Sequence, residues 1–290
     1  MKKILITGAN SYIGQAFEEY MQAYSKDYQI DTVDMIGDKW KERSFTGYDV
    51  VYHVAGIAHS DNGKISPEKE KLYYSVNTDL TIATAKKAKA EGVKQFIFMS
   101  SAIVYGNSGS IGKKKLITKD TPVSPANCYG DSKVQAEKGL QLIEDENFKV
   151  VILRPPMIYG KGSKGNYPIL ARFAQKMRFF PYVKNERSML YVENLCEFVR
   201  LMIENDENGI FFPQNEKYTN TSEMVQAIAN VHGKKLRLIK GFGWALKLLS
   251  LFTGLVNKAF GNLVYDISIS NYKESYCVKT FEESIKETEK

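Results

Sequence analysis

The chain has 290 residues, of which 43% are hydrophobic, so it is long enough for one large domain or for a main domain with a smaller companion. Its 40 Lys and Arg against 33 Asp and Glu give a net charge of +7 that is spread along the sequence. This charge indicates a solvated surface or, alternatively, attraction of an anionic small molecule. The sequence lacks the usual nucleic-acid-binding motifs, so we expect no nucleic-acid partner.

The three cysteines, Cys128, Cys196 and Cys277, lie far apart and lack the spacing of metal ligands, which favours a reducing compartment. The N-terminus passes from Met1 almost directly into a strand-like run and leaves no room for a secretory signal. We therefore expect a cytoplasmic protein without a metal site.

The first predicted elements are a strand, a glycine turn and a helix. Lys3 to Thr7 forms the strand, GANSYIG forms the turn, and the helix reaches about Tyr24. Such a turn lets backbone amides and the positive helix end face a pyrophosphate, with Gly8 allowing the bend and Gly14 the close approach of helix to strand. Ser11 replaces the middle glycine, so the motif alone is weak, and a simple tight turn is the alternative.

The next strand, Gln29 to Val33, ends at Asp34, which is placed to accept hydrogen bonds from an adenosine ribose. A loop-capping aspartate is the alternative interpretation. Only fourteen residues separate Asp34 from Asp49, and they include two glycines. A full helix and strand hardly fit there, so we expect an abbreviated sheet in this region.

Residues 49–56, DVVYHVAG, have the pattern of a buried strand that ends in small residues, where a cofactor can lie against the backbone. His53 in this strand is expected to be structural. Residues 60–71 are polar and are expected to form a mobile loop. Leu72 to Gly92 is predicted as a helix, in which Asn77 is placed to hydrogen-bond the following strand.

Val93 to Met99 is another predicted buried strand, and Ser101 follows its carboxyl end, where ligands bind in doubly wound sheets. After a Pro-containing loop, Tyr129 to Glu144 is predicted as a helix. Tyr129 and Lys133 are four residues apart and share one helical face. A nearby ammonium lowers a phenol pKa, which would make Tyr129 a usable acid or base, while Ser101 would orient a substrate oxygen.

Lys149 to Arg154 forms a further predicted strand, after which the alternation of strands and helices loosens. Asn166 lies in a glycine-rich, basic loop, and Arg187 carries the planar donor fork that suits a diphosphate. A turn residue and a surface cation are their alternative interpretations.

Residues 242–264 form the most apolar stretch of the chain and are long enough to span a bilayer. Lys247, Lys258 and internal glycines argue against spanning. We expect a helical pair that caps a substrate domain without membrane contact, with interfacial membrane attachment as the alternative. Residues 282–290 are expected to form a charged, frayed tail.

Five motifs occur in a characteristic order and at characteristic separations: TGANSYIG, DVVYHVAG, SSAIVYG, YGDSK and RPPMIYG. In this combination the chain resembles an extended short-chain dehydrogenase/reductase of the nucleotide-sugar (UDP-hexose) 4-epimerase and 4-ketoreductase group. The resemblance covers about residues 1 to 205 well and the remainder more loosely. It implies an α/β fold, namely a Rossmann-type doubly wound parallel sheet in residues 1–160, onto which residues 187–205 pack back. It also implies a smaller C-terminal substrate domain in residues 161–290.

The resemblance also implies residue roles. Ser101, Tyr129 and Lys133 match the catalytic set. Residues that match cofactor contacts are Gly8, Ser11, Tyr12, Ile13, Gly14, Asp34, Ala55, Gly56, Asn77, Tyr129, Lys133 and Pro156. Residues that match substrate contacts are Ser101, Ala102, Asn166 and Arg187. The implied cofactor is NAD, with NADP left open by Ser11 and by the short connection after Asp34.

Sugar-nucleotide 4,6-dehydratases of this family carry Asp and Glu directly after the catalytic hydroxyl residue, whereas this chain has Ala102 and Ile103 there. Neither side chain exchanges a proton, so we predict no dehydratase activity. The remaining hypotheses are NAD-dependent 4-epimerisation of a UDP-sugar, single NAD(P)H-dependent reduction of a nucleotide 4-keto sugar, and an NAD-binding regulator without turnover. The reductase alternative comes from the resemblance of GKGSKGNYP and NERSMLYVENL to 4-ketoreductases. Relatives also imply a homodimer formed through helices 72–92 and 129–144.

Overall fold

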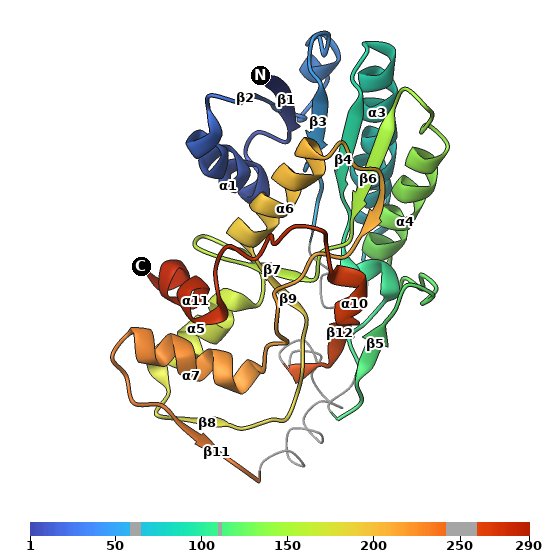
Figure 1. Ribbon diagram of the computed structural model, residues 1–290. Helices are drawn as coiled ribbons and strands as arrows, with labels where there is room; N and C mark the ends of the chain where they lie inside the picture. The colour runs from blue at the N-terminus through green and yellow to red at the C-terminus, as the bar shows by residue number, and fades with distance from the viewer. Residues whose placement is uncertain (59–64, 110–111, 242–259) are drawn as a thin grey trace. The chain divides into compact units, whose positions relative to one another are not determined.

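A computed structural model of the chain describes residues 1–58, 65–109, 112–241 and 260–290 (Figure 1). These residues form two compact units that interleave along the chain. The first consists of residues 1–106, 122–155 and 195–213, and the second of residues 107–121, 156–194 and 214–290. Residues 107–121 belong to the second unit and residues 195–213 to the first, so each unit is assembled from separate parts of the chain.

The first unit is built on a six-stranded parallel sheet with the order β10-β6-β4-β3-β1-β2 (Figure 1). Its strands are β1 (Lys2–Thr7), β2 (Tyr28–Val33), β3 (Val50–His53), β4 (Gln95–Met99), β6 (Lys149–Leu153) and β10 (Gly209–Phe211). Its α-helices are α1 (Tyr12–Met21), α2 (Pro67–Tyr74), α3 (Leu80–Ala90), α4 (Cys128–Gln141) and most of α6 (Val192–Glu204). The strand order and the parallel pairing confirm the expected Rossmann-type α/β fold.

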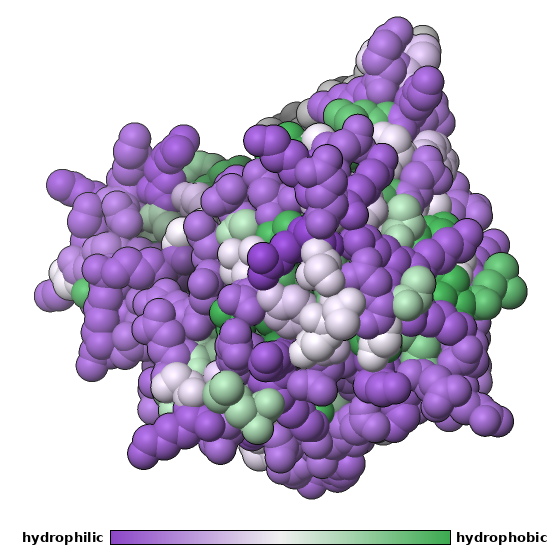
Figure 2. Space-filling view, turned by 90° about the horizontal axis from the view of Figure 1, so that it is seen from above, coloured by the Kyte–Doolittle hydropathy of each residue, from purple (hydrophilic) through white to green (hydrophobic). Residues whose placement is uncertain are grey.

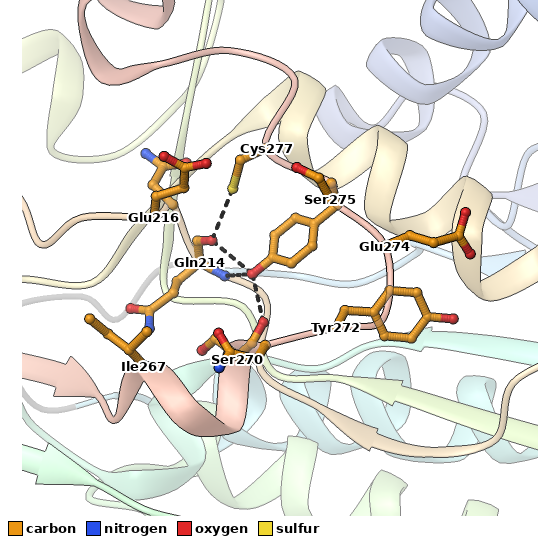
Figure 3. A pocket seen from close by; sticks show the side chains of 11 residues that line it. Gln214, Glu216, Ile267, Ser270, Tyr272, Glu274, Ser275 and Cys277 are labelled. Carbon is orange, nitrogen blue, oxygen red and sulfur yellow. Dashed lines mark hydrogen bonds between the residues drawn. The ribbon is translucent and has the colours of Figure 1, made fainter.

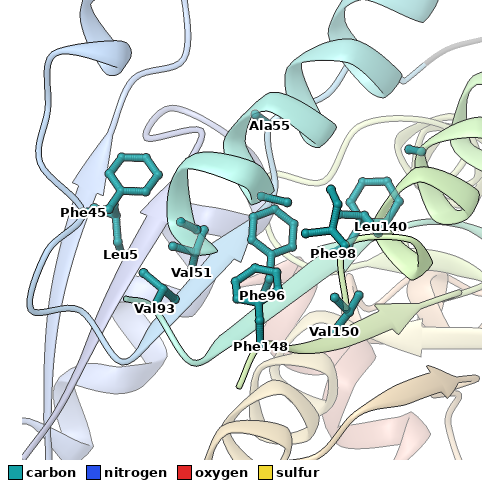
Figure 4. Packing of buried hydrophobic residues seen from close by; sticks show 14 of the residues in the cluster. Leu5, Phe45, Val51, Ala55, Val93, Phe96, Phe98, Leu140, Phe148 and Val150 are labelled. Carbon is teal, nitrogen blue, oxygen red and sulfur yellow. The ribbon is translucent and has the colours of Figure 1, made fainter. Parts of the chain in front are cut away.

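Both faces of the sheet are buried, as strands in a parallel sheet require. On one face Leu5, Val51 and Phe96 point into a core that also receives Leu140 of α4 (Figure 4). On the other face the ring of Tyr52 makes an edge contact with a phenylalanine of α1, with ring centroids 5.1 Å apart. Side chains alternate between the two faces of the sheet along each strand, so each face has its own hydrophobic core.

The region between Asp34 and Asp49 is abbreviated, as the sequence predicts. It contains one short 3₁₀ turn, η2 (Lys39–Lys41), and β2 remains at the edge of the sheet. Trp40 and Phe45 are buried against the core in place of a helix. The expected helix to Tyr24 ends as α1 at Met21 and continues as a 3₁₀ turn.

Two expectations for this unit need correction. Residues 60–71 were expected to form a loop, but α2 begins at Pro67, because Ser66 caps its start and proline suits the first helical turn. Residues 59–64 lie outside the described residues. The predicted helix 72–92 is interrupted by a π-helical turn, η3 (Ser75–Asp79), between α2 and α3.

The second unit holds three two-stranded parallel ribbons and four α-helices among the described residues. The strand pairs are β5 (Lys115–Ile117) with β12 (Leu263–Tyr265), β7 (Met157–Tyr159) with β9 (Met189–Tyr191), and β8 (Phe179–Pro181) with β11 (Arg237–Ile239). The helices are α5 (Tyr167–Lys176), α7 (Thr221–Val231), α10 (Ile267–Ser270) and α11 (Phe281–Glu289).

The C-terminal tail is ordered as helix α11, so the expectation of a frayed tail for residues 282–290 is wrong. Thr280 and Glu283 form a reciprocal capping box at its start. Ser284 lies 2.6 Å from the hydroxyl of Tyr159, and Ile285 is buried. The charged sequence therefore forms a helix, because its N-terminal backbone amides are capped and its apolar side is buried.

Most of the apolar stretch 242–264 lies outside the described residues, and the expected helical pair with it. Its last residues form β12. Within the part of the chain that the structure describes, no helix has the length and apolar character needed to cross a membrane.

Candidate active site

The glycine turn after β1 brings two backbone segments into direct contact. Gly8 has a φ of +109°, and a Cβ there would lie 2.8 Å from the amide nitrogen of Ala55, just beyond β3. Only glycine allows this approach. Ser11, which stands at the middle glycine position, is the N-cap of α1 and accepts a hydrogen bond from the amide of Gly14 at 3.0 Å. The substitution therefore preserves the helix start.

The start of α1 is suited to a diphosphate. Tyr12 and Ile13 open the helix, and the first amides of a helix have no partner within it. A Cβ at Gly14 would lie 3.2 Å from Val54 and 3.3 Å from the carbonyl of Gly8. The close packing of this turn leaves the amide-lined helix end as the place for a cofactor phosphate.

Asp34 is exposed directly after β2 and serves as a loop cap. Its Oδ1 accepts a hydrogen bond from the amide of Ile36 at 3.0 Å. One carboxylate oxygen is thus used by the loop, and a second remains for a ribose hydroxyl, so the two interpretations of Asp34 are compatible.

The end of β3 is held by Asn77, which is fully buried in the π-helical turn η3. Its Nδ2 donates to the carbonyl of Ile57 and to the hydroxyl of Ser132, both at 3.1 Å, and its Oδ1 accepts from the amide of Ile57 at 3.0 Å. A Cβ at Gly56 would lie 3.1 Å from this Oδ1 and 3.2 Å from the Nζ of Lys133. The π-turn therefore joins the chain after β3 to helix α4.

His53 is a structural histidine, as the sequence predicts. Its Nδ1 lies 2.7 Å from the hydroxyl of Thr7, and its Nε2 lies 3.1 Å from the hydroxyl of Thr81. Thr81 donates its own proton to the carbonyl of Asn77, so it accepts from the Nε2–H of His53. Burial, with a smaller contribution from the charge of Lys133, lowers the pKa of His53 to about 3.

This pKa predicts a loss of stability in acid. Between about pH 6.5, the ordinary histidine pKa, and pH 3, the unfolded chain binds a proton that the folded chain does not, so the free energy of unfolding falls as the pH falls. Urea unfolding at pH 7 and pH 5 should show a decrease of about 2 kcal/mol from this group. His53→Gln should reduce the pH dependence. Equal pH dependence in wild type and His53→Gln would contradict this role.

Ser101 and Tyr129 meet at the carboxyl end of β4. Ser101 caps the 3₁₀ turn η4 (Ala102–Tyr105), and α4 packs so closely against this turn that a Cβ at Gly130 would lie 2.9 Å from the carbonyl of Ile103. Burial raises the pKa of Tyr129 to about 12, while a hydrogen bond with Ser101 lowers it and the nearby Tyr73 raises it. The phenol is therefore protonated at neutral pH in the protein without ligands.

Lys133 lies one turn after Tyr129 and is buried. Its Nζ donates to the carbonyl of Met99 at 2.9 Å and lies 4.7 Å above the ring of Phe98. Burial lowers the pKa of Lys133 to about 8, and the Glu137 carboxylate acts in the opposite direction. The expectation that Lys133 lowers the pKa of Tyr129 is not met here, because burial of the phenol dominates.

A buried polar network next to this set was not anticipated from the sequence. Arg154, at the end of β6, donates from Nη2 to Glu137 at 2.6 Å, from Nε to the same carboxylate at 3.1 Å, and from Nη1 to Tyr105 at 2.7 Å. Ser100 also donates to Glu137. Burial opposes the charge of Arg154, but the hydrogen bonds and charge of Glu137 raise its pKa. Glu137 and Arg154 are 17 residues apart in sequence, so no local spacing reveals the network.

The predicted substrate-contacting residues Asn166 and Arg187 lie in the second unit. Asn166 precedes α5, and its carbonyl accepts from the amides of Ile169 and Leu170, both at 3.2 Å. Arg187 exchanges two backbone hydrogen bonds with Thr219, and burial lowers its pKa to about 10, so the guanidinium is still charged at neutral pH. Pro156, predicted to contact the cofactor, is buried and begins the segment 156–194 of the second unit. Ala55, Gly56 and Ala102 belong to the first unit.

A separate polar hollow lies within the second unit and contains none of the predicted site residues (Figure 3). The hydroxyl of Tyr276 ties its walls together, because it lies 2.9 Å from the carbonyl of Gln214 and 3.0 Å from the carbonyl of Ser270. Cys277 approaches the same Gln214 carbonyl at 3.6 Å.

Two features together define an extended short-chain dehydrogenase/reductase. One is the Rossmann-type sheet with its glycine turn, and the other is the set of hydroxyl, phenol and ammonium at the end of β4. Residues 4–212 match the family described as the NAD dependent epimerase/dehydratase family. The chain belongs to this family. Its relatives include enzymes of the nucleotide-sugar epimerase and reductase group. The expected cofactor class, NAD, agrees with the family.

Two curated relatives illustrate the similarity. A UDP-glucose 4-epimerase of Vibrio cholerae is 31% identical over 99% of this chain and 94% of its own length. An N-acetyl-alpha-D-glucosaminyl-diphospho-ditrans,octacis-undecaprenol 4-epimerase of Escherichia coli O157:H7 is 29% identical over 80% of this chain and 73% of its own length.

Solved structures show the same fold. A dTDP-4-dehydrorhamnose reductase of Clostridium acetobutylicum has a TM-score of 0.74 with 17% identity, covering 99% of this chain and 98% of the other. A UDP-glucuronic acid 4-epimerase of Bacillus cereus, solved with NAD, has a TM-score of 0.71 with 17% identity, covering 98% and 96%. At these identities the likeness concerns the fold alone.

Proposed function

We propose that the protein is an NAD-dependent 4-epimerase of a UDP-linked hexose. The observation that carries this proposal is the assembly of Ser101, Tyr129 and Lys133 at the carboxyl end of β4, in the same unit as the glycine turn. Ligands bind at this edge of a doubly wound sheet. The similarity to UDP-glucose 4-epimerases along nearly the whole chain supports the choice of reaction.

The residues present suit a dinucleotide. Gly8 and Gly14 allow the backbone to approach closely, and Tyr12 and Ile13 supply the first amides of α1. Asp34 follows β2, at the position where a ribose is held in this type of fold. A bound nicotinamide would accept a hydride from C4 of the sugar and return it to the opposite face. The free oxygen of Asp34 favours NAD, because a carboxylate repels the 2′-phosphate of NADP.

The chain's own groups handle the proton. Tyr129 acts as a phenolate, which requires the bound cofactor and Lys133 to bring its pKa down from about 12. The phenolate takes the proton from the C4 hydroxyl and gives it back after the sugar has turned over. Ser101 donates a hydrogen bond to the same oxygen and fixes its position. Lys133, held by the carbonyl of Met99, supplies a positive charge beside the phenol and a donor for the cofactor ribose.

We propose further that the enzyme does not eliminate water. Ala102 and Ile103 occupy the places where dehydratases carry an acid and a base. Glu137, the buried carboxylate beside this stretch, is held by Arg154 and Ser100 and points into its own network. Ala102, Ile103 and Glu137 therefore supply no proton donor or acceptor for a step at C5 or C6 of the sugar.

The test is incubation of the purified protein with UDP-glucose, UDP-galactose and their N-acetylamino counterparts, followed by separation of the nucleotide sugars. We expect C4 epimers at equilibrium without net consumption of cofactor. Stoichiometric oxidation of NAD(P)H with a 4-keto sugar, and no epimer, would replace the proposal by a reductase. Turnover only of an undecaprenyl-diphosphate sugar would assign the substrate to a lipid carrier, and formation of a 4-keto-6-deoxy sugar would overturn the exclusion of dehydration.

A further inference from the structure

Two segments of the chain are entirely without acidic residues. Residues 147–185 and 224–265 contain no Asp or Glu and together carry fourteen Lys and Arg. Neither segment is a dense basic run, so the charge looks evenly spread along the sequence. The fold joins them, because β8 pairs in parallel with β11 and α5 packs against α7, all within the second unit.

The outer side of α5 is both apolar and basic. Ile169, Arg172, Phe173 and Lys176 are spaced by three, one and three residues, so they share one helical face. All four are exposed, and Ile169 and Phe173 expose 42% and 41% of their surface. Large apolar side chains in such a row on a helix are uncommon at a surface that faces only water.

The same character continues after the helix. Lys176, Met177, Arg178 and Phe179 are consecutive and all exposed. In the ribbon that follows, Phe179 stands opposite Arg237, and Ile239 lies two residues further on the same side. Phe179 is 52% exposed and Ile239 38%. We call the outer side of α5 together with this side of β8 and β11 the docking face.

The cations of the docking face are not neutralised by the protein. Within residues 1–58, 65–109, 112–241 and 260–290, no ion pair to a carboxylate is made by these cations, namely Arg172, Lys176, Arg178, Arg237 and Lys240. Figure 2 shows a face that is mainly hydrophilic, with apolar side chains in small groups. Unpaired cations interleaved with exposed aromatic and aliphatic side chains indicate a partner that is anionic and apolar at once.

Both ends of the apolar segment 242–259 are attached to this part of the unit. β11 ends at Ile239, three residues before the segment begins. Phe260, which follows it, lies with its ring 5.8 Å from that of Phe180, and Phe180 lies 6.3 Å from Phe173 of α5. In sequence the segment, FGWALKLLSLFTGLVNKA, has two lysines and no acidic residue. β11 and Phe260, which flank this segment in sequence, therefore both lie beside the docking face.

We propose that the docking face binds the surface of an anionic phospholipid bilayer, with the cations at the headgroups and the apolar side chains in the interface. A nucleic acid would satisfy the cations but leave Ile169, Phe179 and Ile239 in water. The membrane attachment is peripheral, since it uses side chains of a folded surface. The proposal differs from the expectation of no membrane contact, and it does not depend on the substrate.

The test is flotation of the full-length protein with vesicles through a density gradient, which separates bound protein from aggregates. We expect flotation with phosphatidylglycerol and phosphatidylcholine mixtures, little with phosphatidylcholine alone, and a decrease with salt. Arg172→Gln/Lys176→Gln should lower the partition coefficient about 25-fold, at about fivefold per cation. The matched control is Lys26→Gln/Lys94→Gln, which removes the same charge from exposed positions of the first unit and should float almost like wild type.

The apolar contribution has its own variant. Phe173→Ser/Phe179→Ser should weaken flotation at constant net charge, whereas Leu142→Ser, at an 88% exposed leucine of the first unit, should not. Circular dichroism confirms that each variant is folded. Equal flotation with both kinds of vesicle, no flotation at all, or equal losses in the control variants would overturn the proposal. So would binding of a single-stranded oligonucleotide that depends on Arg172 and Lys176 while anionic vesicles are ignored.

Discussion

Tyr129→Phe is expected to lower kcat by about 10²- to 10⁴-fold, because the substitution removes the group that exchanges the C4 hydroxyl proton. The phenol is half-buried between Ser101 and Tyr73, and a phenylalanine keeps the ring contact with Tyr73, whose centroid lies 5.8 Å away. The fold and the cofactor site should therefore persist. Steady-state epimerisation gives kcat, and calorimetric titration with NAD gives the dissociation constant, which should change little.

A neighbouring tyrosine provides the matched control for this prediction. Tyr74 follows Tyr73 on α2, and its hydroxyl donates to Asp131 at 2.8 Å. Tyr74→Phe removes one phenolic hydroxyl from the same region without touching the proton-transfer set, so kcat should stay close to that of wild type. If Tyr129→Phe retained wild-type kcat, the catalytic role of Tyr129 and with it the proposed mechanism would be wrong.

Glu137→Gln is expected to lower the free energy of unfolding by about 3 to 5 kcal/mol, because it leaves the buried guanidinium of Arg154 without its counter-charge. Glu137 is 3% exposed and Arg154 8%, so water cannot replace the lost carboxylate. Denaturant unfolding measures the change. The matched substitution Glu186→Gln, which breaks the exposed pair with Lys114, should cost less than about 1 kcal/mol.

A double substitution separates the buried charge from the packing. Glu137→Leu/Arg154→Met removes both charges together, and apolar replacement of a whole buried pair is often close to neutral. We expect it to be more stable than Glu137→Gln. Equal losses for the exposed and buried Glu→Gln variants would show that the network contributes no more than a surface ion pair.

The sequence predicts those parts of the site whose signal is local. The turn from Thr7 to Gly14 and the spacing of Tyr129 and Lys133 lie within single stretches, so periodicity and glycine positions were enough. The short connection after Asp34 was read correctly from its length. The residue roles and the homodimer stay predictions. The Tyr129→Phe variant tests the role of Tyr129.

What the sequence does not predict depends on contacts between distant residues. Glu137 and Arg154 look like ordinary surface charges until α4 packs beside the end of β6. Helix α11 was taken for a frayed tail because its stabilising contacts come from Tyr159 and Tyr167, more than a hundred residues earlier. The docking face is visible only when the fold brings the two acid-free segments together through the pairing of β8 with β11.

The interleaving of the two units has a consequence for how the protein is synthesised. Strand β6 completes its pairing only with β10, and the chain reaches β10 after the whole segment 156–194 of the second unit has been made. Until then Val151 and its neighbours form an open, apolar strand edge of the kind that promotes aggregation. A fragment ending near residue 160 would keep that edge exposed, so the first unit is expected to become a stable body only with the later chain attached.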